Sequence, residues 1–494
     1  MASLLTLDQL RAAVIDGRTR NIRYRQNELQ SLHLSLRDSV DKIRPAISRD
    51  LGGDAKASES EYYLTLNAVS EFYKPLDLSV ALENEYLIAK GSDNSSQRVG
   101  KGLVIIRPTT HTRFYSIICP LAAAIAAGNC VLLELGDSSL EIDVVLKELL
   151  PQALDSDTFG ISDHPIEDPS VLASSFLVDQ TGSSSTTTLN QLSSNTSARA
   201  IAIVDRTADI ELAARSIINA RFSFQGASAY SPDLVVVNEF VKDDFVAACT
   251  WHASRYFASG ASPSHPREAE DSVTKHLLKA AEDKGEISVF GSSGFMLASV
   301  VDRSSPVTRM KVSGCHLPIM GCTSLVDALM SQRPESTLLA AYIFSDAPTA
   351  KFLAQYLEAC ITFVNQIPVH FLVGPAAPLS PLPTRPGHKY SPEMFSSERP
   401  QYISRPSSDF LAIQKLFDGE KKPGSEARLL TEIRKAAVKP LPKTGQPLGY
   451  AVGFFEQGIL LGGGLFLSVV APALGYGTFV LGRYAWKAVA SMRV

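Results

Sequence analysis

The sequence predicts an α/β protein built on parallel sheets and followed by a C-terminal transmembrane helix. Short apolar runs alternate with helical stretches, first at residues 103–106, 121–128 and 130–134. Strand, helix and strand in this order are typical of a parallel α/β unit. A second alternation follows Asp205, and the 26 residues 457–482 carry no charge. An apolar segment of that length can cross a bilayer as a helix.

Composition indicates a large globular protein with more than one lobe. The chain has 494 residues, of which 45% are hydrophobic and 20% charged, enough to bury a sizeable core. The net charge of −4 provides no concentrated basic surface, so we expect no nucleic-acid partner. The six cysteines are scattered without a CxxC pair, which favours buried reduced thiols over disulfides or a zinc site. The N-terminus lacks the pattern of a secretory signal.

Local patterns predict the individual elements. Leu29, Leu32 and Leu36 recur at helical spacing, which indicates a long helical segment over residues 8–49 that Gly52-Gly53 ends. Further helices are predicted at 59–72, 121–128, 210–220, 275–284 and 410–439, and strands at 103–106, 130–134, 175–178, 200–204, 234–237 and 338–344. The dense prolines of residues 368–406 predict a loop or arm, and residues 440–445 a linker to the tail.

The uncharged tail is interpreted as a membrane anchor. Aromatic residues near its ends, such as Tyr450 and Trp486, suit a membrane interface. A buried core helix or an oligomer-contact helix is the alternative. Basic residues lie on both sides, at positions 435, 439 and 443 before it and 483, 487 and 493 after it, so they do not decide its orientation. A span this close to the C-terminus, inserted after synthesis, would leave the bulk of the chain in the cytosol.

Several segments together resemble one enzyme superfamily. They are residues 102–106 leading to 120–129, 203–205 with 208–215, 222–233, 241–245, 317–319 and 364–365. This set resembles the aldehyde dehydrogenases. His388-Lys389-Tyr390-Ser391 is similar to a late element of the class 3 branch, which includes fatty aldehyde dehydrogenases with a C-terminal membrane helix. The resemblance covers about residues 5–400, and the tail fits it.

The resemblance implies a domain plan. A Rossmann-like cofactor-binding domain would comprise residues 1–82 and 99–204, and a catalytic-type α/β domain residues 205–367. Residues 83–98 and 368–400 would form a small β oligomerisation arm. A helical linker over residues 401–449 would then lead to the membrane anchor at 450–482.

The family's catalytic residues are replaced in this sequence. Its reaction needs a thiolate that adds to the aldehyde, an Asn that stabilises the oxyanion and a Glu that activates water. The resemblance places the nucleophile at Ala229, the oxyanion residue at Thr110 and the general base at Asn195. A methyl group cannot attack a carbonyl, so the resemblance implies that catalysis is impaired.

The positions implied for the cofactor, NAD or NADP, are also degraded. They are Thr181, Gly182, Ser183, Glu134 and Lys311. Glu134 stands where the family has a Lys for the adenosine ribose, and Lys311 where it has a Glu for the nicotinamide ribose. Only twelve residues follow Gly182 before the general-base position. That spacing predicts a shortened helix and a damaged pyrophosphate site, because the amides at a helix N-terminus bind such groups.

Each of these interpretations has an alternative. The nucleophile loop could be misaligned, although Phe222, Gly226, Pro232 and Asp233 fix its register. Ser228 could replace the cysteine, but an alcohol provides no thiolate at neutral pH. His111 is either a structural histidine or a catalytic one. Glu134 and Lys311 are either solvated surface charges or marks of a cofactor cleft with inverted charge.

We therefore expect a membrane-anchored aldehyde dehydrogenase family protein whose ancestral reaction, the NAD(P)-dependent oxidation of fatty aldehydes to acids, is impaired. Such a chain would act as a scaffold, a regulator or a partner subunit. It would form a homodimer, or a heterodimer with an active relative. The alternative is an active NAD(P)-dependent enzyme on a long-chain or specialised-metabolite aldehyde.

Overall fold

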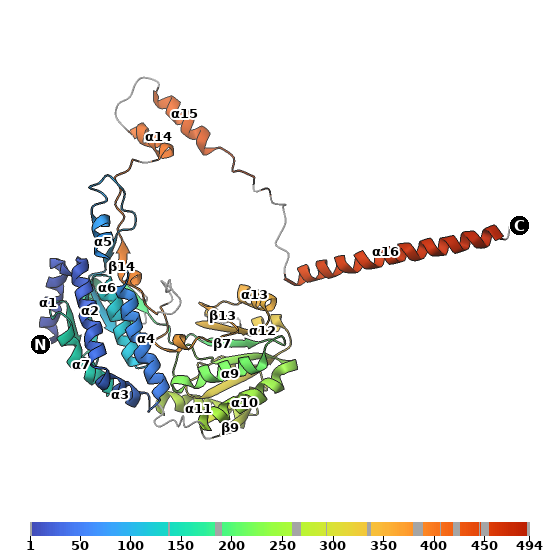
Figure 1. Ribbon diagram of the computed structural model, residues 1–494, viewed down its shortest axis with the longest axis horizontal. Coiled ribbons are helices and arrows are strands. Elements are labelled where there is room, and N and C mark those ends of the chain that lie inside the picture. The colour runs from blue at the N-terminus through green and yellow to red at the C-terminus, as the bar shows by residue number, and fades with distance from the viewer. Residues whose placement is uncertain are drawn as a thin grey trace. The chain divides into compact units, whose positions relative to one another are not determined.

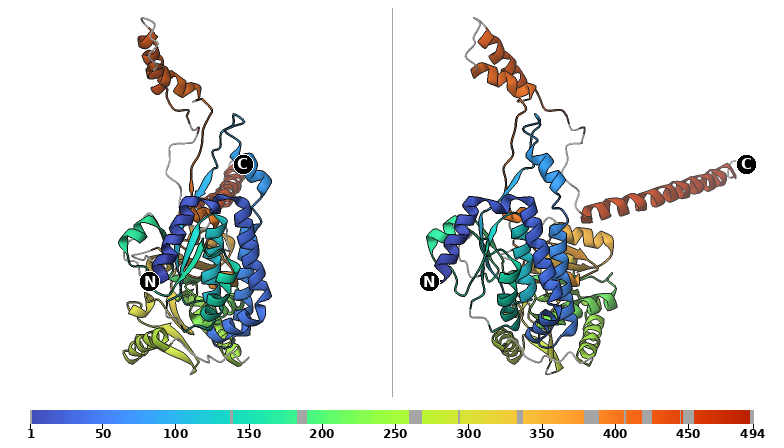
Figure 2. Two further views of the ribbon diagram at one scale, coloured as in Figure 1. Left: turned by 90° about the vertical axis from the view of Figure 1, so that its left-hand side faces the viewer. Right: turned by 60° about the vertical axis from the view of Figure 1, so that its left-hand side comes forward.

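The computed structural model describes residues 2–136, 139–182, 190–258, 268–292, 294–332, 337–378, 389–405, 407–417, 425–443, 445 and 454–491. The chain divides into two compact units, Met1–Ser404 and Arg405–Val494. Within the first unit, two lobes lie side by side, each centred on a sheet (Figure 1, Figure 2). The predicted α/β fold is therefore confirmed.

The first sheet has the strand order β4-β3-β2-β5-β6, and all its neighbouring strands are parallel. Its strands are β2 (Leu103–Arg107), β3 (Cys130–Glu134), β4 (Phe159–Ser162), β5 (Phe176–Asp179) and β6 (Gln191–Ser193). Leu103 and Ile105 join the apolar cluster that includes helix α1 (Ala2–Asp16), while Val104 and Ile106 join the one that includes α6 (Arg113–Ala126). Both faces are covered, which explains why the strands are continuous apolar runs.

The N-terminal region is several helices rather than one long segment. After α1 come η1 (Arg18–Arg20), α2 (Ile22–Asp38), α3 (Val40–Asp50), α4 (Ala55–Tyr73) and α5 (Leu78–Glu85). Gly17 has a φ of 77°, a left-handed conformation that ends α1 and that glycine adopts readily. Ser39 separates α2 from α3. The predicted leucines of α2 are fully buried, and α4 starts from Asp54, whose carboxylate accepts two backbone N–H groups. The other helices of this lobe are α7 (Glu141–Ala153) and α8 (Pro169–Ser174).

The second sheet has the strand order β13-β12-β7-β8-β11-β10-β9. Among the described strands of this sheet, β9 and β10 pair antiparallel and the other neighbours pair parallel. Its strands are β7 (Ala200–Val204), β8 (Leu234–Asn238), β9 (Ile287–Ser292), β10 (Phe295–Val300), β11 (His316–Cys322), β12 (Ala340–Phe344) and β13 (Thr362–Val364). Its helices are α9 (Ile210–Phe222), α10 (Lys242–Ala258), α11 (Glu268–Asp283), α12 (Leu325–Ser331) and α13 (Ala347–Tyr356). The structure pairs β7 with β8 and β12, so residues 200–204 belong to the second sheet.

The proline-rich segment begins inside the core. Phe371 and Leu372 of the short turn η5 (Val369–Leu372) are buried, so the predicted loop or arm packs against the core at this point. Further on, β14 (Ser396–Glu398) pairs antiparallel with β1 (Arg98–Gly100). This pairing places Arg98, the last residue of the first segment implied as an arm, beside Glu398 of the second segment.

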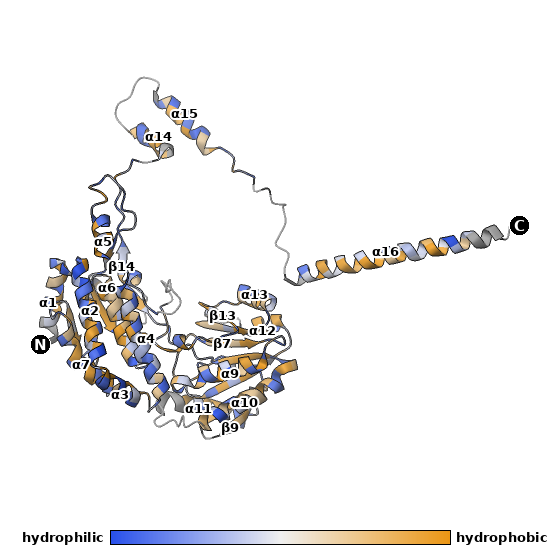
Figure 3. Ribbon diagram, in the orientation of Figure 1, coloured by the Kyte–Doolittle hydropathy of each residue, from blue (hydrophilic) through white to orange (hydrophobic). Residues whose placement is uncertain are grey.

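The second unit contains α14 (Ser408–Phe417), α15 (Ser425–Ala437) and α16 (Phe454–Ser491). Residues Glu456–Trp486 of α16 are long and apolar enough to span a membrane, and none of that window is buried. Its apolar character runs along the helix in Figure 3. The described structure therefore gives no support to the alternative of a buried core helix.

A buried carboxylate joins α4 to the start of α6. Glu61 is 1% exposed and accepts hydrogen bonds from the backbone N–H groups of Tyr115 and Phe114, in the first turn of α6. Burial raises the pKa of Glu61 from 4.5 to about 8, although these two hydrogen bonds oppose the shift. The native fold therefore holds a proton that the unfolded chain releases near pH 4.5.

Glu61 should make the protein less stable as pH rises from about 4.5 to 8, by at most about 1.4 kcal/mol per pH unit. The native state binds more protons than the unfolded state in that window, so its free energy of unfolding falls with pH. The variant Glu61→Gln should weaken this dependence, and urea unfolding between pH 5 and 8 would measure it. Replacement of the exposed Glu148 by Gln is the control; equal slopes for all three proteins would contradict the prediction.

Candidate functional site

The segment around Ala229 is a tight loop between α9 and β8. It begins with η2 (Ser223–Gly226), in which Phe224 and Gln225 have φ angles of 53° and 57°. Gly226 packs so closely on the neighbouring segment that a Cβ atom there would lie 2.1 Å from the Gly314 carbonyl oxygen. The backbone is thus fixed, and at the predicted nucleophile position it presents only the methyl group of a half-buried alanine.

Lys311 reaches the carbonyl group of Ala229. Its Nζ donates to the carbonyl oxygens of Ala229 at 2.7 Å and Ala198 at 3.0 Å, and to Asp233 Oδ2 at 2.9 Å. These three acceptors match the three protons of an ammonium group. Burial lowers the pKa of Lys311, and the Asp233 carboxylate opposes that shift. The side chain is 25% exposed and ion-paired, so it is not the solvated surface charge that the sequence left open.

Asp233 is the centre of a buried charged cluster. It is fully buried and accepts the backbone N–H groups of Ala200 at 2.8 Å and Val312 at 3.0 Å. Arg221 Nη1 lies 3.6 Å from its Oδ1 atom. Arg221, also fully buried, donates to the carbonyl oxygens of residues 226, 232, 312 and 314. We name Arg221, Asp233 and Lys311 the ionic triad.

From the sequence, Asp233 served only to fix the alignment of the nucleophile loop, and Arg221 was not predicted as a site residue. The signal available for it was an arginine between Ala220 and Phe222, on the apolar side of α9, because a buried arginine needs a partner.

The other two predicted catalytic positions have different surroundings. The Asn195 Oδ1 atom accepts the backbone N–H groups of Ser197 and Ala198 and the Ser197 hydroxyl. Asn195 thus stabilises its own turn, which also supplies the Ala198 carbonyl oxygen to Lys311. Thr110 is exposed, in the connection between β2 and α6.

His111 links that connection to the nucleophile loop. One of its ring nitrogens lies 2.9 Å from the Leu372 carbonyl oxygen, and its ring meets Phe224 edge-on at 6.0 Å. It is buried, in agreement with the structural alternative. Ser228 is buried as well, and its hydroxyl oxygen accepts the Tyr230 N–H at 3.3 Å.

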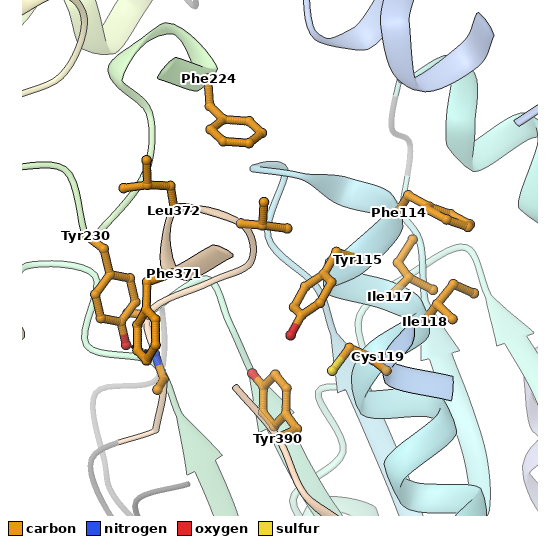
Figure 4. Packing of buried hydrophobic residues seen from close by; sticks show 14 of the residues in the cluster. Phe114, Tyr115, Ile117, Ile118, Cys119, Phe224, Tyr230, Phe371, Leu372 and Tyr390 are labelled. Atoms are coloured by element: carbon orange, nitrogen blue, oxygen red, sulfur yellow. Dashed lines mark hydrogen bonds between the residues drawn. The ribbon is translucent and has the colours of Figure 1, made fainter. Parts of the chain in front are cut away.

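Apolar and aromatic side chains surround the loop (Figure 4). Lys389 is buried among them, donates to the Phe371 carbonyl oxygen at 2.9 Å and lies 3.4 Å from the centre of the Tyr230 ring. Burial places its pKa well below the usual value. Burial also raises the pKa of the Cys119 thiol to about 12. A thiol with such a pKa carries almost no thiolate at neutral pH.

A cleft of about 620 Å³ opens at the carboxyl ends of β2, β3 and β5, the edge where parallel α/β sheets bind ligands. Arg107, Arg113, Glu134, Glu167 and Thr181 are among its lining residues. Glu134 is buried and accepts Arg107 Nε at 2.7 Å and the Ile166 N–H at 2.8 Å. Its charge is therefore neutralised within the cleft, and the surface-charge alternative does not apply to it.

The turn after β5 is held by a carboxylate and packed against a threonine. Both the N–H and the hydroxyl of Thr181 donate to Asp179 Oδ1, at 2.9 and 2.7 Å. A Cβ atom on Gly182 would lie 2.5 Å from Thr196 Oγ1. Residues 180–190, eleven in all, connect the parallel strands β5 and β6, fewer than the dozen that such a crossover usually needs. Ser183 lies outside the described residues.

Comparison with known proteins identifies the family. The model of the aldehyde dehydrogenase family matches residues 9–376, so the chain belongs to that family. Aldehyde dehydrogenase family 3 member B3 of Mus musculus is 27% identical over 361 residues, which are 68% of this chain and 75% of the relative. Member B2 of the same organism is 26% identical over 82% of this chain and 90% of its own length.

Solved structures show the same fold. The substrate-bound Staphylococcus aureus AldH aligns with a TM-score of 0.68 at 19% identity, over 87% of this chain and 99% of that one. The glyceraldehyde-3-phosphate dehydrogenase GapN of Methanocaldococcus jannaschii, complexed with NADP, aligns with a TM-score of 0.63 at 15% identity, over 81% and 93%.

Replacement of Asp233 by Ala should lower the free energy of unfolding by about 3–5 kcal/mol, because it leaves the buried Arg221 and the partly buried Lys311 without their carboxylate. Chemical denaturation of the purified protein would measure the loss. Replacement of the exposed Asp244 on α10 by Ala is the matched control, with an expected change within about 0.5 kcal/mol. Equal stability of the two variants would show that the ionic triad does not hold the loop.

Proposed function

We propose that this chain is a membrane-anchored aldehyde dehydrogenase homologue that no longer oxidises aldehydes and acts as a scaffold or partner subunit. The observation that carries the proposal is the hydrogen bond of 2.7 Å from Lys311 Nζ to the Ala229 carbonyl oxygen. It ties the nucleophile position to a structural ion pair. The same loop presents no thiol.

The chemistry of the family explains why this arrangement is inactive. Loss of a nucleophile or its base costs on the order of 10⁶ in turnover, and such losses within one catalytic unit are not additive. In addition, Asn195 is engaged in its own turn, and an amide cannot take a proton from water as a carboxylate does. Thr110 provides no amide donor for an oxyanion. The sequence change at Ala229 is thus one of several that act in the same direction.

We propose that the cleft at β2 and β3 also binds NAD or NADP poorly. Arg107 and Glu134 already satisfy each other, so neither is free to fix a ribose. The buried Asp179 carboxylate accepts the Thr181 N–H, an amide that would otherwise face an anion, and places a negative charge beneath the turn. The residues present therefore do not fit a pyrophosphate.

Dimerisation is proposed from the family and from the paired strands. One relative is named the dimeric NADP-preferring aldehyde dehydrogenase of Rattus norvegicus. In this chain, β1 and β14 hold residues 98–100 and 396–398 together, and Arg98 and residues 396–398 belong to the proposed arm. A chain that keeps this arm could pair with itself or with an active relative, and the second pairing would give it a regulatory role.

The tail supports membrane attachment. The apolar window of α16 is unburied and has a mean hydropathy of 1.9, and burial in lipid is the environment that such a helix favours. We propose a single C-terminal span with the bulk of the chain in the cytosol.

The purified tail-deleted chain, residues 1–443, should produce no NADH or NADPH from fatty aldehydes. Replacement of Ala229 by Cys should not restore turnover, because the positions of the base and the oxyanion donor remain changed. A spectrophotometric assay at 340 nm, run beside an active class 3 enzyme, would measure both. Cofactor-dependent turnover that survives Ser228→Ala would support the alternative, an active enzyme on a long-chain or specialised-metabolite aldehyde.

Truncation after Tyr450 should move the protein from the membrane pellet to the soluble fraction after carbonate extraction, since it removes the whole of α16. A matched truncation after Met492, which leaves the apolar window in place, should stay in the pellet. If the shorter protein remained in the pellet, α16 would not be the anchor.

A further inference from the structure

The helix α14 carries an exposed apolar stripe. Phe410, Ile413 and Phe417 are exposed, and their spacing of three and four residues places them on one side of the helix. Phe417 is 84% exposed. Large side chains aligned in this way are uncommon on a surface that faces only water.

The helix α15 contributes to the same kind of surface. It contacts α14, and its side chains Leu429 and Ile433 are partly buried, while Leu430 is exposed. In the described parts of α14 and α15, some apolar side chains are therefore partly buried and others remain exposed. We name Phe410, Ile413 and Phe417, the exposed stripe of α14, the apolar face.

The charge of the pair is basic on the side that leads to α16. Arg428 lies 3.4 Å from Glu432 on α15, so this acidic group is matched. Residues 433–443 then contain four basic side chains and no acidic one. Basic residues beside an apolar helix face favour a surface of anionic lipid.

The pair is attached closely to the membrane span. The 17 backbone steps from Ala437 to Phe454 extend at most about 60 Å. A helix pair on such a tether remains at high local concentration near a bilayer that holds α16, so even weak contacts with lipid become occupied.

We propose that α14 and α15 lie on the membrane surface, with the apolar face among the acyl chains and residues 434–443 against anionic headgroups. The proposal rests on the membrane attachment proposed for α16. It gives the pair a function beyond that of a linker, because it fixes how closely the folded unit Met1–Ser404 is held to the lipid. A second copy of the chain and the protein's own folded unit are the other occupants that this face could have.

Hydrogen–deuterium exchange of the full chain in nanodiscs would test the proposal. We expect amides of α14 and α15 to exchange at least about ten-fold more slowly in discs of phosphatidylcholine with 30% phosphatidylserine than in discs of phosphatidylcholine alone. Salt at 0.5 M should remove part of this difference by screening. Amides of α16 should be protected in both discs, so failure of the anchor would be seen separately.

Paired variants make the test specific. Phe410→Ser with Phe417→Ser should abolish the lipid-dependent protection, whereas Phe240→Ser should not, since Phe240 is a similarly exposed side chain (76%) in the first unit. Arg434→Gln with Lys435→Gln should remove the preference for phosphatidylserine while circular dichroism shows unchanged helix content.

Equal exchange of α14 and α15 in both discs would overturn the proposal. So would protection that is the same in detergent, which would indicate the protein's own unit, or protection that rises with protein concentration, which would indicate a second copy.

Discussion

The structure of the candidate site depends on one buried carboxylate. Asp233 is fully buried and accepts hydrogen bonds from Lys311 and from the backbone of residues 200 and 312, with Arg221 within 3.6 Å. Its partners come from the end of α9, the start of β7 and the segment before β11. A single carboxylate thus connects the loop of Ala229 with the start of β7 and with the segment before β11.

This interaction explains how the loop keeps its conformation. In the aldehyde dehydrogenases, the resemblance assigns a carboxylate to the position of Lys311 and a carboxylate base to that of Asn195. Here Lys311 donates to the backbone of residues 198 and 229, and so links the turn of Asn195 with the loop of Ala229. The polar groups are satisfied by one another, as buried groups must be. At these positions the described side chains form hydrogen bonds that stabilise the fold.

Much of the fold followed from the sequence because the signals are local. The strands β2 and β3 are apolar on both faces, and the buried leucines of α2 follow helical spacing. The break between α1 and α2 was missed, because it depends on the left-handed conformation of Gly17 within a continuing helical pattern. The burial of Phe371 and Leu372 in the proline-rich segment was not predicted, since proline density gives no information on packing.

The identities of the site residues came from resemblance, but their interactions did not. Lys311 and Asp233 are 78 positions apart, and Arg107 and Glu134 are 27 apart, so no local pattern connects them. Whether such charges are solvated or paired depends on tertiary packing. The structure resolves that choice in favour of pairing at both positions.

The most direct test of the account is the thermal unfolding of residues 1–443 with increasing NAD⁺ or NADP⁺. A ligand that binds the native state stabilises it by about 2.7 kcal/mol at one hundred times its Kd. We expect an unchanged melting temperature up to roughly 1 mM cofactor, the upper end of common KM values, while the melting temperature of an active class 3 enzyme should rise under the same conditions. A melting temperature that rises with the logarithm of cofactor concentration would contradict it.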